Sequence, residues 1–217
     1  MKRNILIAIV GVLAIGLGAF VLTGNAPEPV TPVNAQTSDS AEVDTSSVKE
    51  MTLGEEDAPV TLVEYASFTC PHCATFHTNV FPKLKKDYID TGKVKFVFRE
   101  VYFDRYGLWA GMVARCGGGM RYFGIVDLIF DNQREWAQGE PAQIAGNLRK
   151  FGKQAGLDDE TLDACLTDGE KAAAMAAVYQ KNADADGISS TPSLVINGTT
   201  HPNMSYDDLK ELIDAEL

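Results

Sequence analysis

The residues best placed to do chemistry are the two cysteines of the segment SFTCPHCATFH. Two residues separate Cys70 from Cys73. This spacing suits a structural disulfide, a pair of metal ligands or a redox-active thiol pair. A structural disulfide across so short a loop would constrain little of the unfolded chain. Zinc would need two further ligands, and no second Cys-X-X-Cys segment occurs, although His72 and His77 lie nearby. The spacing therefore favours a redox pair, and we expect no metal.

The elements on either side of the pair must place it at the start of a helix. Residues 60–68, VTLVEYASF, are rich in β-branched and aromatic side chains and predict a strand. Apolar residues then recur at helical spacing from Phe76 to Tyr88, with a kink expected at Pro82. The predicted strand therefore runs directly into the amino end of a helix at Cys70.

That position predicts an activated thiol. A thiolate in the first helical turn meets unpaired backbone N–H groups and the positive end of the helix dipole, and both lower its pKa. We therefore predict Cys70 as the nucleophile and Cys73 as the buried resolving thiol. Pro71 and His72 are predicted to tune Cys70, because His72 can add N–H donation and, when protonated, positive charge. A lower pKa stabilises the reduced pair and makes its disulfide a stronger oxidant.

The rest of the pattern predicts an α/β chain. Residues 93–100 predict a second strand, and the chain from about 105 to 186 is helical and Ala-rich, broken at glycine-containing turns. Residues 193–196 predict a strand, followed by Asn197-Gly198, a pair that favours tight hairpins, and a closing amphipathic helix. This order indicates a thioredoxin-like fold with an all-helical domain inserted between the strand-helix-strand unit and the closing hairpin.

The amino-terminal residues predict a signal peptide or a membrane anchor. Two basic residues precede an uncharged apolar run, residues 5–23, whose length fits both. The positive-inside bias sends the rest of the chain across the membrane. We expect residues 1–23 to be the signal or anchor, residues 24–47 to be a flexible linker, and residues 48–217 to be the folded domain.

Composition and cysteine count limit the function further. The 217 residues carry a formal net charge of −11, and 45% of them are hydrophobic, which is enough for a core. Such an acidic chain argues against a nucleic-acid partner, which requires a basic face. Four cysteines in an exported chain allow three pairings, of which Cys70–Cys73 with Cys116–Cys165 is the most economical.

Three segments carry a family resemblance. VEYASFTCPHCATFH, together with LGEEDAPVTL before it and GISSTPSLVING far downstream, resembles the DsbA-type thiol:disulfide interchange family. The resemblance covers residues 48–217, and CPHC is associated with the oxidising branch. It implies a periplasmic oxidase that needs no cofactor and passes its disulfide to reduced exported polypeptides. It also implies re-oxidation by a quinone-linked membrane partner of the DsbB type.

The resemblance assigns roles to residues outside the CPHC segment. Thr191-Pro192 takes the place of the family's cis-proline loop, which faces the active disulfide and binds substrate. Glu64 takes the place of a buried acid beneath the cysteines that can assist proton transfer at the resolving thiol. The alternative is that Glu64 is a carboxylate on the solvent face of the strand. Cys116 and Cys165 are either buried thiols or a second, structural disulfide found in some members. For four other residues we predict only helix-face packing: His77, His201, Trp109 and Trp136.

Two other classes of function remain open. A disulfide isomerase or reductase is the nearest alternative, but isomerases of this fold carry an amino-terminal dimerisation domain where this chain has a polar linker, so we expect a monomer. A tethered peptide-binding chaperone or metal carrier with incidental cysteines is the other. The reduction potential of the Cys70–Cys73 couple distinguishes an oxidase from an isomerase or reductase. We expect a periplasmic protein, either soluble after cleavage or tethered to the inner membrane by residues 5–23.

Overall fold

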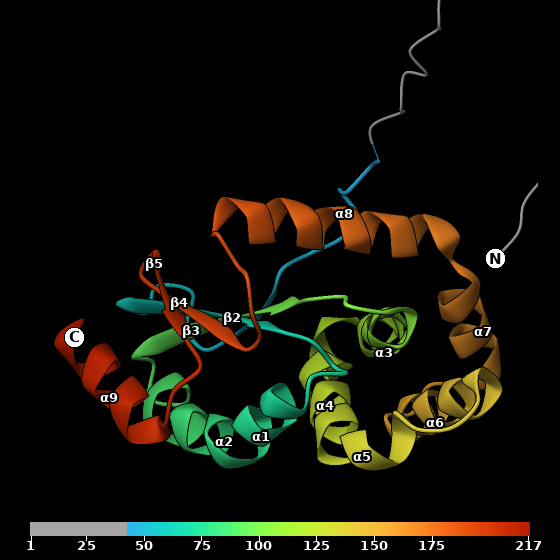
Figure 1. Cartoon of the computed structure of the whole chain (residues 1–217), viewed down its shortest axis with the longest axis horizontal. Coiled ribbons are helices and arrows are strands. Elements are labelled where there is room, and N and C mark those ends of the chain that lie inside the picture. Colours follow the sequence, from blue (N-terminus) through green and yellow to red (C-terminus); the bar gives the residue numbers. More distant parts are fainter. Residues whose placement is uncertain (1–42) are drawn as a thin grey trace, which may run out of the picture. The chain divides into compact units, whose positions relative to one another are not determined.

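A five-stranded sheet with helices on both faces forms the body of the protein (Figure 1). The computed structural model describes residues 43–217; the predicted signal or anchor and most of the predicted linker lie outside these residues. β2 and β3 are parallel, and the other neighbouring pairs are antiparallel, in the order β1-β3-β2-β4-β5. The strands are β1 (Met51–Leu53), β2 (Val60–Ala66), β3 (Val94–Glu100), β4 (Ser193–Ile196) and β5 (Thr199–Pro202).

Most of the chain between the strands is helical. The first group follows β2, the second lies between β3 and β4, and one helix closes the chain. The helices are α1 (Pro71–Asn79), α2 (Phe81–Leu84), the π-helical turn η1 (Lys85–Ile89), α3 (Arg105–Cys116), α4 (Gly118–Asp131), α5 (Gln133–Trp136), α6 (Pro141–Gln154), α7 (Asp159–Thr167), α8 (Gly169–Ala185) and α9 (Tyr206–Ala215).

The alternation of side chains along β2 decides what each face of the sheet contacts. Leu62 and Ala66 point into the large core formed with α1, α2, α4 and α9, and Glu64 shares their face because side chains alternate along a strand. Val63 and Tyr65 point to the opposite face, where they pack with residues of α8. The acidic residue of the strand is therefore turned towards the helix that begins at Cys70.

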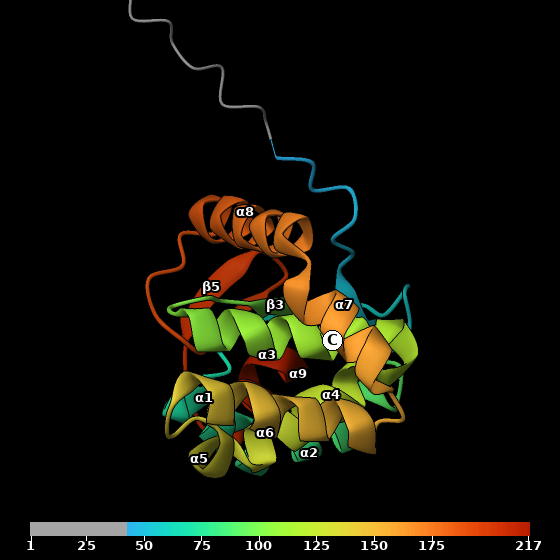
Figure 2. The same cartoon turned by 90° about the vertical axis from the view of Figure 1, so that its right-hand side faces the viewer.

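The helical insertion is confirmed as part of a mixed α/β fold, but it divides into two parts. Helices α3, α6 and α7 pack on one another (Figure 2), and α4 packs both on α3 and on α1. α8 instead crosses a face of the sheet, where Tyr179 and Ala183 contact its apolar side chains (Figure 1). The predicted insertion, residues 105–186, therefore ends in a helix that belongs to the sheet's own core.

Local details follow from particular residues. The helix after the cysteines breaks at Val80, and Pro82 lies in the first turn of α2, where its missing N–H is tolerated. Asn197 and Gly198 have φ values of 44° and 87°, the left-handed pair that a tight hairpin requires. β1 was not predicted, because three residues at a sheet edge carry too little pattern. Within residues 43–217, no helix has the length and apolar character needed to cross a membrane.

Candidate active site

The start of α1 holds Cys70 in an extended backbone conformation. Cys70 is the N-cap, with φ −84° and ψ 118°, and Pro71 is the first helical residue, where no N–H is needed. The Cys70 carbonyl accepts hydrogen bonds from the backbone N–H groups of Cys73 and Ala74, at 3.1 and 3.2 Å. The structure holds the pair as two thiols. Cys73 is fully buried, whereas Cys70 retains 9% exposure, so only Cys70 can meet a substrate.

The two thiols have opposite pKa shifts. The pKa of Cys70 is lowered from 9.0 to about 5, mainly by a hydrogen bond from the Cys73 side chain, whose effect outweighs desolvation. Hydrogen bonds from Thr191 and from the backbone N–H groups of Cys73 and His72 lower this pKa further. Burial is the main cause that raises the pKa of Cys73, and the charges of Glu64 and Cys70 raise it further. At neutral pH Cys70 is therefore a thiolate and Cys73 a thiol.

The low pKa of Cys70 predicts a pH-dependent stability of the reduced protein. The pKa of Cys70 is about 5 in the folded protein and 9.0 in the unfolded chain. The contribution of the Cys70 thiolate to the free energy of unfolding is therefore complete above pH 9, declines as pH falls and is lost at pH 5. The oxidised protein has no such contribution. We therefore expect the melting temperature of the reduced form, minus that of the oxidised form, to rise between about pH 4.5 and about pH 8. Thiolate absorbance should titrate with a midpoint near pH 5.

Cys70→Ser provides the control for this measurement, since it keeps Cys73 and removes the group that titrates. The melting temperature of the reduced variant should lack the rise seen in the wild type. An unchanged rise in the variant would assign it to another group.

The loop before β4 faces Cys70. β4 pairs antiparallel with β2, and the register of Tyr65 with Ser193 brings the preceding residues to the end of the sheet where Cys70 lies. The Thr191-Pro192 peptide bond is cis. The Cys70 thiol donates to the Thr191 carbonyl oxygen, at 3.5 Å between Sγ and O. The structure thus brings together Cys70, Cys73 and the Thr191-Pro192 loop, which are about 120 residues apart in the chain.

The residues around the pair include one that the sequence did not indicate. Gln133 is buried, and its side-chain Nε2 donates to the carbonyl oxygens of Phe68 and Cys70, at 2.8 and 2.9 Å. It anchors the loop that carries the nucleophile. His72 is exposed, and only its backbone N–H contributes to the lowered pKa of Cys70, so tuning by its imidazole stays a prediction.

Glu64 is fully buried, and its charge acts on the Cys73 thiol, whose pKa it helps to raise. Its Oε2 is 3.0 Å from Nε2 of His77, which is also buried. The expectation of helix-face packing for His77 describes its aromatic surroundings but misses this contact. A usable signal existed, since Cys73, Phe76 and His77 lie on one face of α1 at spacings of three and four residues, opposite the strand that carries Glu64.

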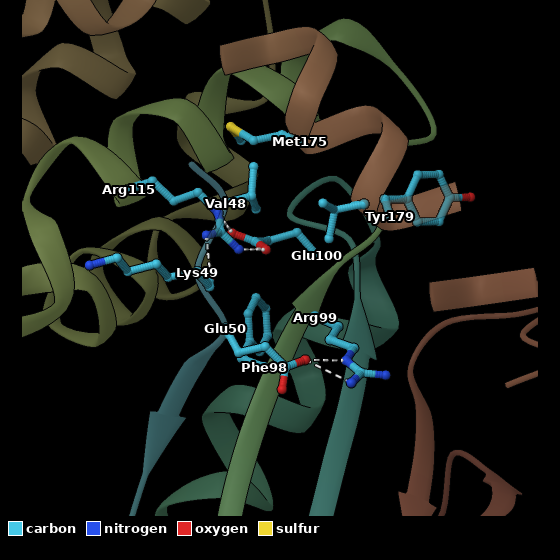
Figure 3. Close-up of a pocket in the computed structure, with 10 residues that line it drawn as sticks. Val48, Lys49, Glu50, Phe98, Arg99, Glu100, Arg115, Met175 and Tyr179 are labelled. Atoms are coloured by element: carbon cyan, nitrogen blue, oxygen red, sulfur yellow. Dashed lines mark hydrogen bonds and ion pairs between the residues drawn. The ribbon is translucent and has the colours of Figure 1, made fainter. Parts of the chain in front are cut away.

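The other two cysteines form a disulfide away from the site. Cys116, the last residue of α3, is bonded to Cys165 in α7. Arg115 precedes Cys116 and makes a buried ion pair with Glu100 at the end of β3 (Figure 3). The hydroxyl of Tyr122 donates to the same carboxylate. The adjoining cavity has a volume of about 30 Å³, which is too small for a substrate or cofactor.

A cleft lies beside the active site. It has a volume of about 450 Å³ and runs between α1 and the chain from the end of α4 through α5. Most of the residues that line it are polar, Thr75 and Arg134 among them, and Pro71 and Phe130 add apolar surface. A long hydrophobic groove, of the kind that would bind an extended apolar peptide, would have a different lining. In the part of the chain from 43 onward, no cluster of three His, Cys, Asp or Glu side chains is arranged to hold a metal ion.

Comparison with known proteins places this geometry in a family. The sequence model of the thioredoxin family matches residues 46–215. A Rickettsia prowazekii protein, named as a proposed protein-disulfide oxidoreductase, is 35% identical over 169 residues, which span 77% of this chain and 61% of the relative. The match thus covers about three fifths of that relative's length. Disulfide bond formation protein D of Bacillus subtilis is 30% identical over 183 residues, or 76% of each chain.

Solved structures give the same result. The crystal structure of Wolbachia pipientis alpha-DsbA1 superposes with a TM-score of 0.71 and 28% identity, covering 77% of this chain and 90% of that one. Oxidised BdbD from Bacillus subtilis gives a TM-score of 0.69 and 29% identity, covering 77% and 92%. The thioredoxin-like fold expected from the sequence is therefore confirmed.

Proposed function

The chain belongs to the thioredoxin family, among the DsbA-type thiol:disulfide oxidoreductases, and from this premise we propose that it oxidises dithiols in exported polypeptides. The Cys70–Cys73 disulfide is donated to the substrate. One observation carries the proposal: the thiol at the amino end of α1, the more accessible of the two, has its pKa lowered to about 5, while burial raises the pKa of its partner. A reduced pair stabilised in this way corresponds to a strongly oxidising disulfide.

The exchange proceeds in two steps. A substrate thiolate attacks Cys70 Sγ, a substrate–Cys70 disulfide forms, and Cys73 leaves with the bonding electrons and takes up a proton. A second substrate thiolate then attacks the substrate sulfur of this mixed disulfide, and Cys70 leaves as a thiolate. The substrate is oxidised by two electrons and the pair is reduced. Cys70 is a good leaving group because its pKa is low.

We assign substrate binding to the Thr191-Pro192 loop. Its position supports this role, since the Thr191 carbonyl lies within hydrogen-bonding distance of Cys70 Sγ. Backbone groups of the loop can pair with an extended peptide by adding a strand to the edge of the site. Pro192 has no N–H to compete with the substrate.

Re-oxidation, location and assembly complete the proposal. A quinone-linked membrane protein of the DsbB type restores the disulfide, and the protein works as a monomer in the periplasm, free or tethered by residues 5–23. The Cys116–Cys165 disulfide supports an oxidising compartment, because such bonds do not persist in a reducing one. The alternative within the same chemistry is an isomerase, which rearranges disulfides without net oxidation.

A substrate with several disulfides separates the two directions. Reduced, unfolded ribonuclease A, supplied with a stoichiometric amount of the oxidised protein, should lose thiols rapidly. Scrambled ribonuclease, supplied with the reduced protein, should regain activity at a rate at least about tenfold lower than the rate of that thiol loss, because a thiolate of low pKa is a weaker attacking nucleophile. Thiol counting and ribonuclease activity provide the readouts. The reverse order of rates would support an isomerase.

A further inference from the structure

The chain between β2 and α1 forms a short turn that carries the nucleophile. β2 ends at Ala66 and α1 begins at Pro71, so residues 67–70, the active-site turn, belong to neither element. The Cys70 backbone N–H donates to the Ser67 carbonyl oxygen, at 3.1 Å, and this hydrogen bond closes the turn. The conformation of the active-site turn fixes the backbone angles of Cys70, and these angles decide where its sulfur lies.

Gln133 holds the active-site turn from the side of the helical insertion. Its Nε2 donates to the carbonyl oxygens of Phe68 and Cys70, at 2.8 and 2.9 Å. A side-chain amide has two N–H donors, so one can serve each carbonyl. The Cys70 carbonyl also accepts from the first N–H groups of α1, and Gln133 is therefore bonded where the turn meets the helix.

The short helix α5 gives this amide a defined position. Gln133, its first residue, is 6% exposed, and Trp136, its last residue, is fully buried. Nε1 of Trp136 donates to the Ile129 carbonyl oxygen in α4, at 2.8 Å. The ring of Phe68 packs on that of Phe130, also in α4, with centroids 5.2 Å apart. The helix and the turn are therefore both packed against α4, and Gln133 joins them.

One of the two hydrogen bonds exceeds what satisfying the backbone requires. A buried carbonyl oxygen needs a donor, and Gln133 serves that structural need at Phe68. The Cys70 carbonyl already accepts from the backbone N–H groups of Cys73 and Ala74, at 3.1 and 3.2 Å. Because a carbonyl oxygen has two lone pairs, these two donors are enough for it. The additional donor at this oxygen points to a role in positioning Cys70.

The position of the Cys70 sulfur matters most in the reduced protein. The structure holds the pair as two thiols, and Sγ of Cys70 has noncovalent contacts with the Thr191 carbonyl oxygen, at 3.5 Å, and with N–H groups at the start of α1. In the oxidised protein, the covalent bond to Cys73 fixes the same sulfur within a narrow geometry. A distorted turn therefore destabilises the reduced form more than the oxidised form.

We propose that Gln133 is a positioning residue for thiol-disulfide exchange, whose amide holds the active-site turn so that Cys70 Sγ stays at the amino end of α1 in the reduced protein. The inference rests on the proposed function, in that Cys70 must be the exchanging thiol. Gln133 acts on the sulfur through the backbone of Cys70. The helical insertion thereby helps to set how strongly oxidising the pair is.

The exchange equilibrium with glutathione reports this effect. Two glutathione thiols form one glutathione disulfide, and the Cys70–Cys73 disulfide takes up their two electrons. Of the two protons released, Cys73 binds one, and the other goes to solvent because Cys70 is a thiolate at neutral pH. Loss of the Gln133 amide raises the free energy of the reduced pair relative to the disulfide, so a smaller fraction of the pair is reduced at a given glutathione ratio.

Three variants of the full chain test the positioning role. Each is equilibrated with glutathione buffers at neutral pH, quenched with acid and alkylated, and the peptide that carries Cys70 and Cys73 is quantified by mass spectrometry. Gln133→Met keeps the length of the side chain without its donors, and Gln133→Asn has an amide that is too short to reach both carbonyls. Gln138→Met is the matched control, because Gln138 Nε2 also donates to a backbone carbonyl, that of Arg134, but is exposed.

The expected result is a selective loss of the reduced form. Gln133→Met should shift the exchange equilibrium towards the disulfide by about tenfold, the size expected when a buried hydrogen bond loses its donor. A tenfold shift makes the pair about 30 mV less oxidising. Gln133→Asn should shift in the same direction, and Gln138→Met should stay within about twofold of the wild type, as is usual for a surface substitution. A purely structural role would destabilise both redox forms equally and leave the equilibrium constant unchanged.

Two results would overturn the positioning role. One is an equilibrium constant of Gln133→Met that lies within about twofold of the wild type or shifts towards the reduced pair. The other is an equal shift in Gln138→Met. If circular dichroism shows that Gln133→Met does not fold, Gln133→Asn decides by the same criteria. Failure of the proposed function would look different, because it concerns the potential of the wild type itself, whereas the difference between variant and wild type still tests Gln133.

Discussion

Cys70→Ser is expected to reduce the oxidation of a dithiol peptide to the uncatalysed background. The remaining thiol, Cys73, is fully buried and its pKa is raised, so it is neither accessible nor ionised at neutral pH. In the wild type the pKa of Cys70 is about 5, and the sulfur is almost fully a thiolate at pH 7. The loss should be measured by stopped-flow fluorescence of a peptide whose emission changes when its disulfide forms.

Cys73→Ser tests the same assignment from the other side. This variant keeps the nucleophile but has no resolving thiol, so covalent complexes between Cys70 and substrate should accumulate. Non-reducing electrophoresis followed by mass spectrometry should identify Cys70 as the bonded residue. A Cys73→Ser variant that turns over normally, or one that forms no complex with a disulfide-containing peptide, contradicts the assigned roles.

Removal of the Cys116–Cys165 disulfide is expected to give the largest change in stability. The bond joins positions 49 residues apart, and closing a loop of this length in the unfolded chain is worth about 4 kcal/mol in the chain-entropy model. Cys116→Ala with Cys165→Ala should lower the free energy of unfolding by about this amount, as measured by urea denaturation. The exchange chemistry should remain, because the bond lies at the far ends of α3 and α7.

A control separates the disulfide from packing changes. The wild type treated with reductant under conditions that open Cys116–Cys165 should lose a similar amount of stability, whereas the double Ala variant should not respond to reductant at these positions. A double variant as stable as the wild type would show that the bond contributes little to the folded state.

The active thiol was predictable because its surroundings are local in sequence. A strand rich in β-branched residues that ends at Ala66 and a helix that begins at Pro71 leave Cys70 at a helix amino terminus, whatever the rest of the chain does. The same holds for the hairpin, because Asn197-Gly198 is short-range turn chemistry. The placement of Thr191 beside Cys70 was implied by the family resemblance, and local patterns alone could not have given it.

What escaped prediction depends on tertiary packing. The sequence does not distinguish His77 from the other residues on the buried face of α1, because only the folded sheet places Glu64 opposite it. Gln133 lies 63 residues from the Cys70 carbonyl it binds, and no local pattern marks an amide for such a role. The helix α8 has the same Ala-rich composition as the insertion, yet it packs on the sheet because Tyr179 and Ala183 contact Val63 and Tyr65 on the face opposite Glu64. Such contacts are fixed only when the sheet forms.

The reduction potential of the Cys70–Cys73 couple tests the central claim most directly. The protein is equilibrated with glutathione buffers of defined ratio at pH 7, and the fraction of the reduced pair is measured after acid quench and alkylation, using Cys116→Ala with Cys165→Ala to exclude the second disulfide. Because the pKa of Cys70 is lowered to about 5, we predict a value more oxidising than about −180 mV, the potential typical of protein disulfide isomerase. A value of about −230 mV or lower, within the range of the glutathione pool, would contradict an oxidase and favour a reductase.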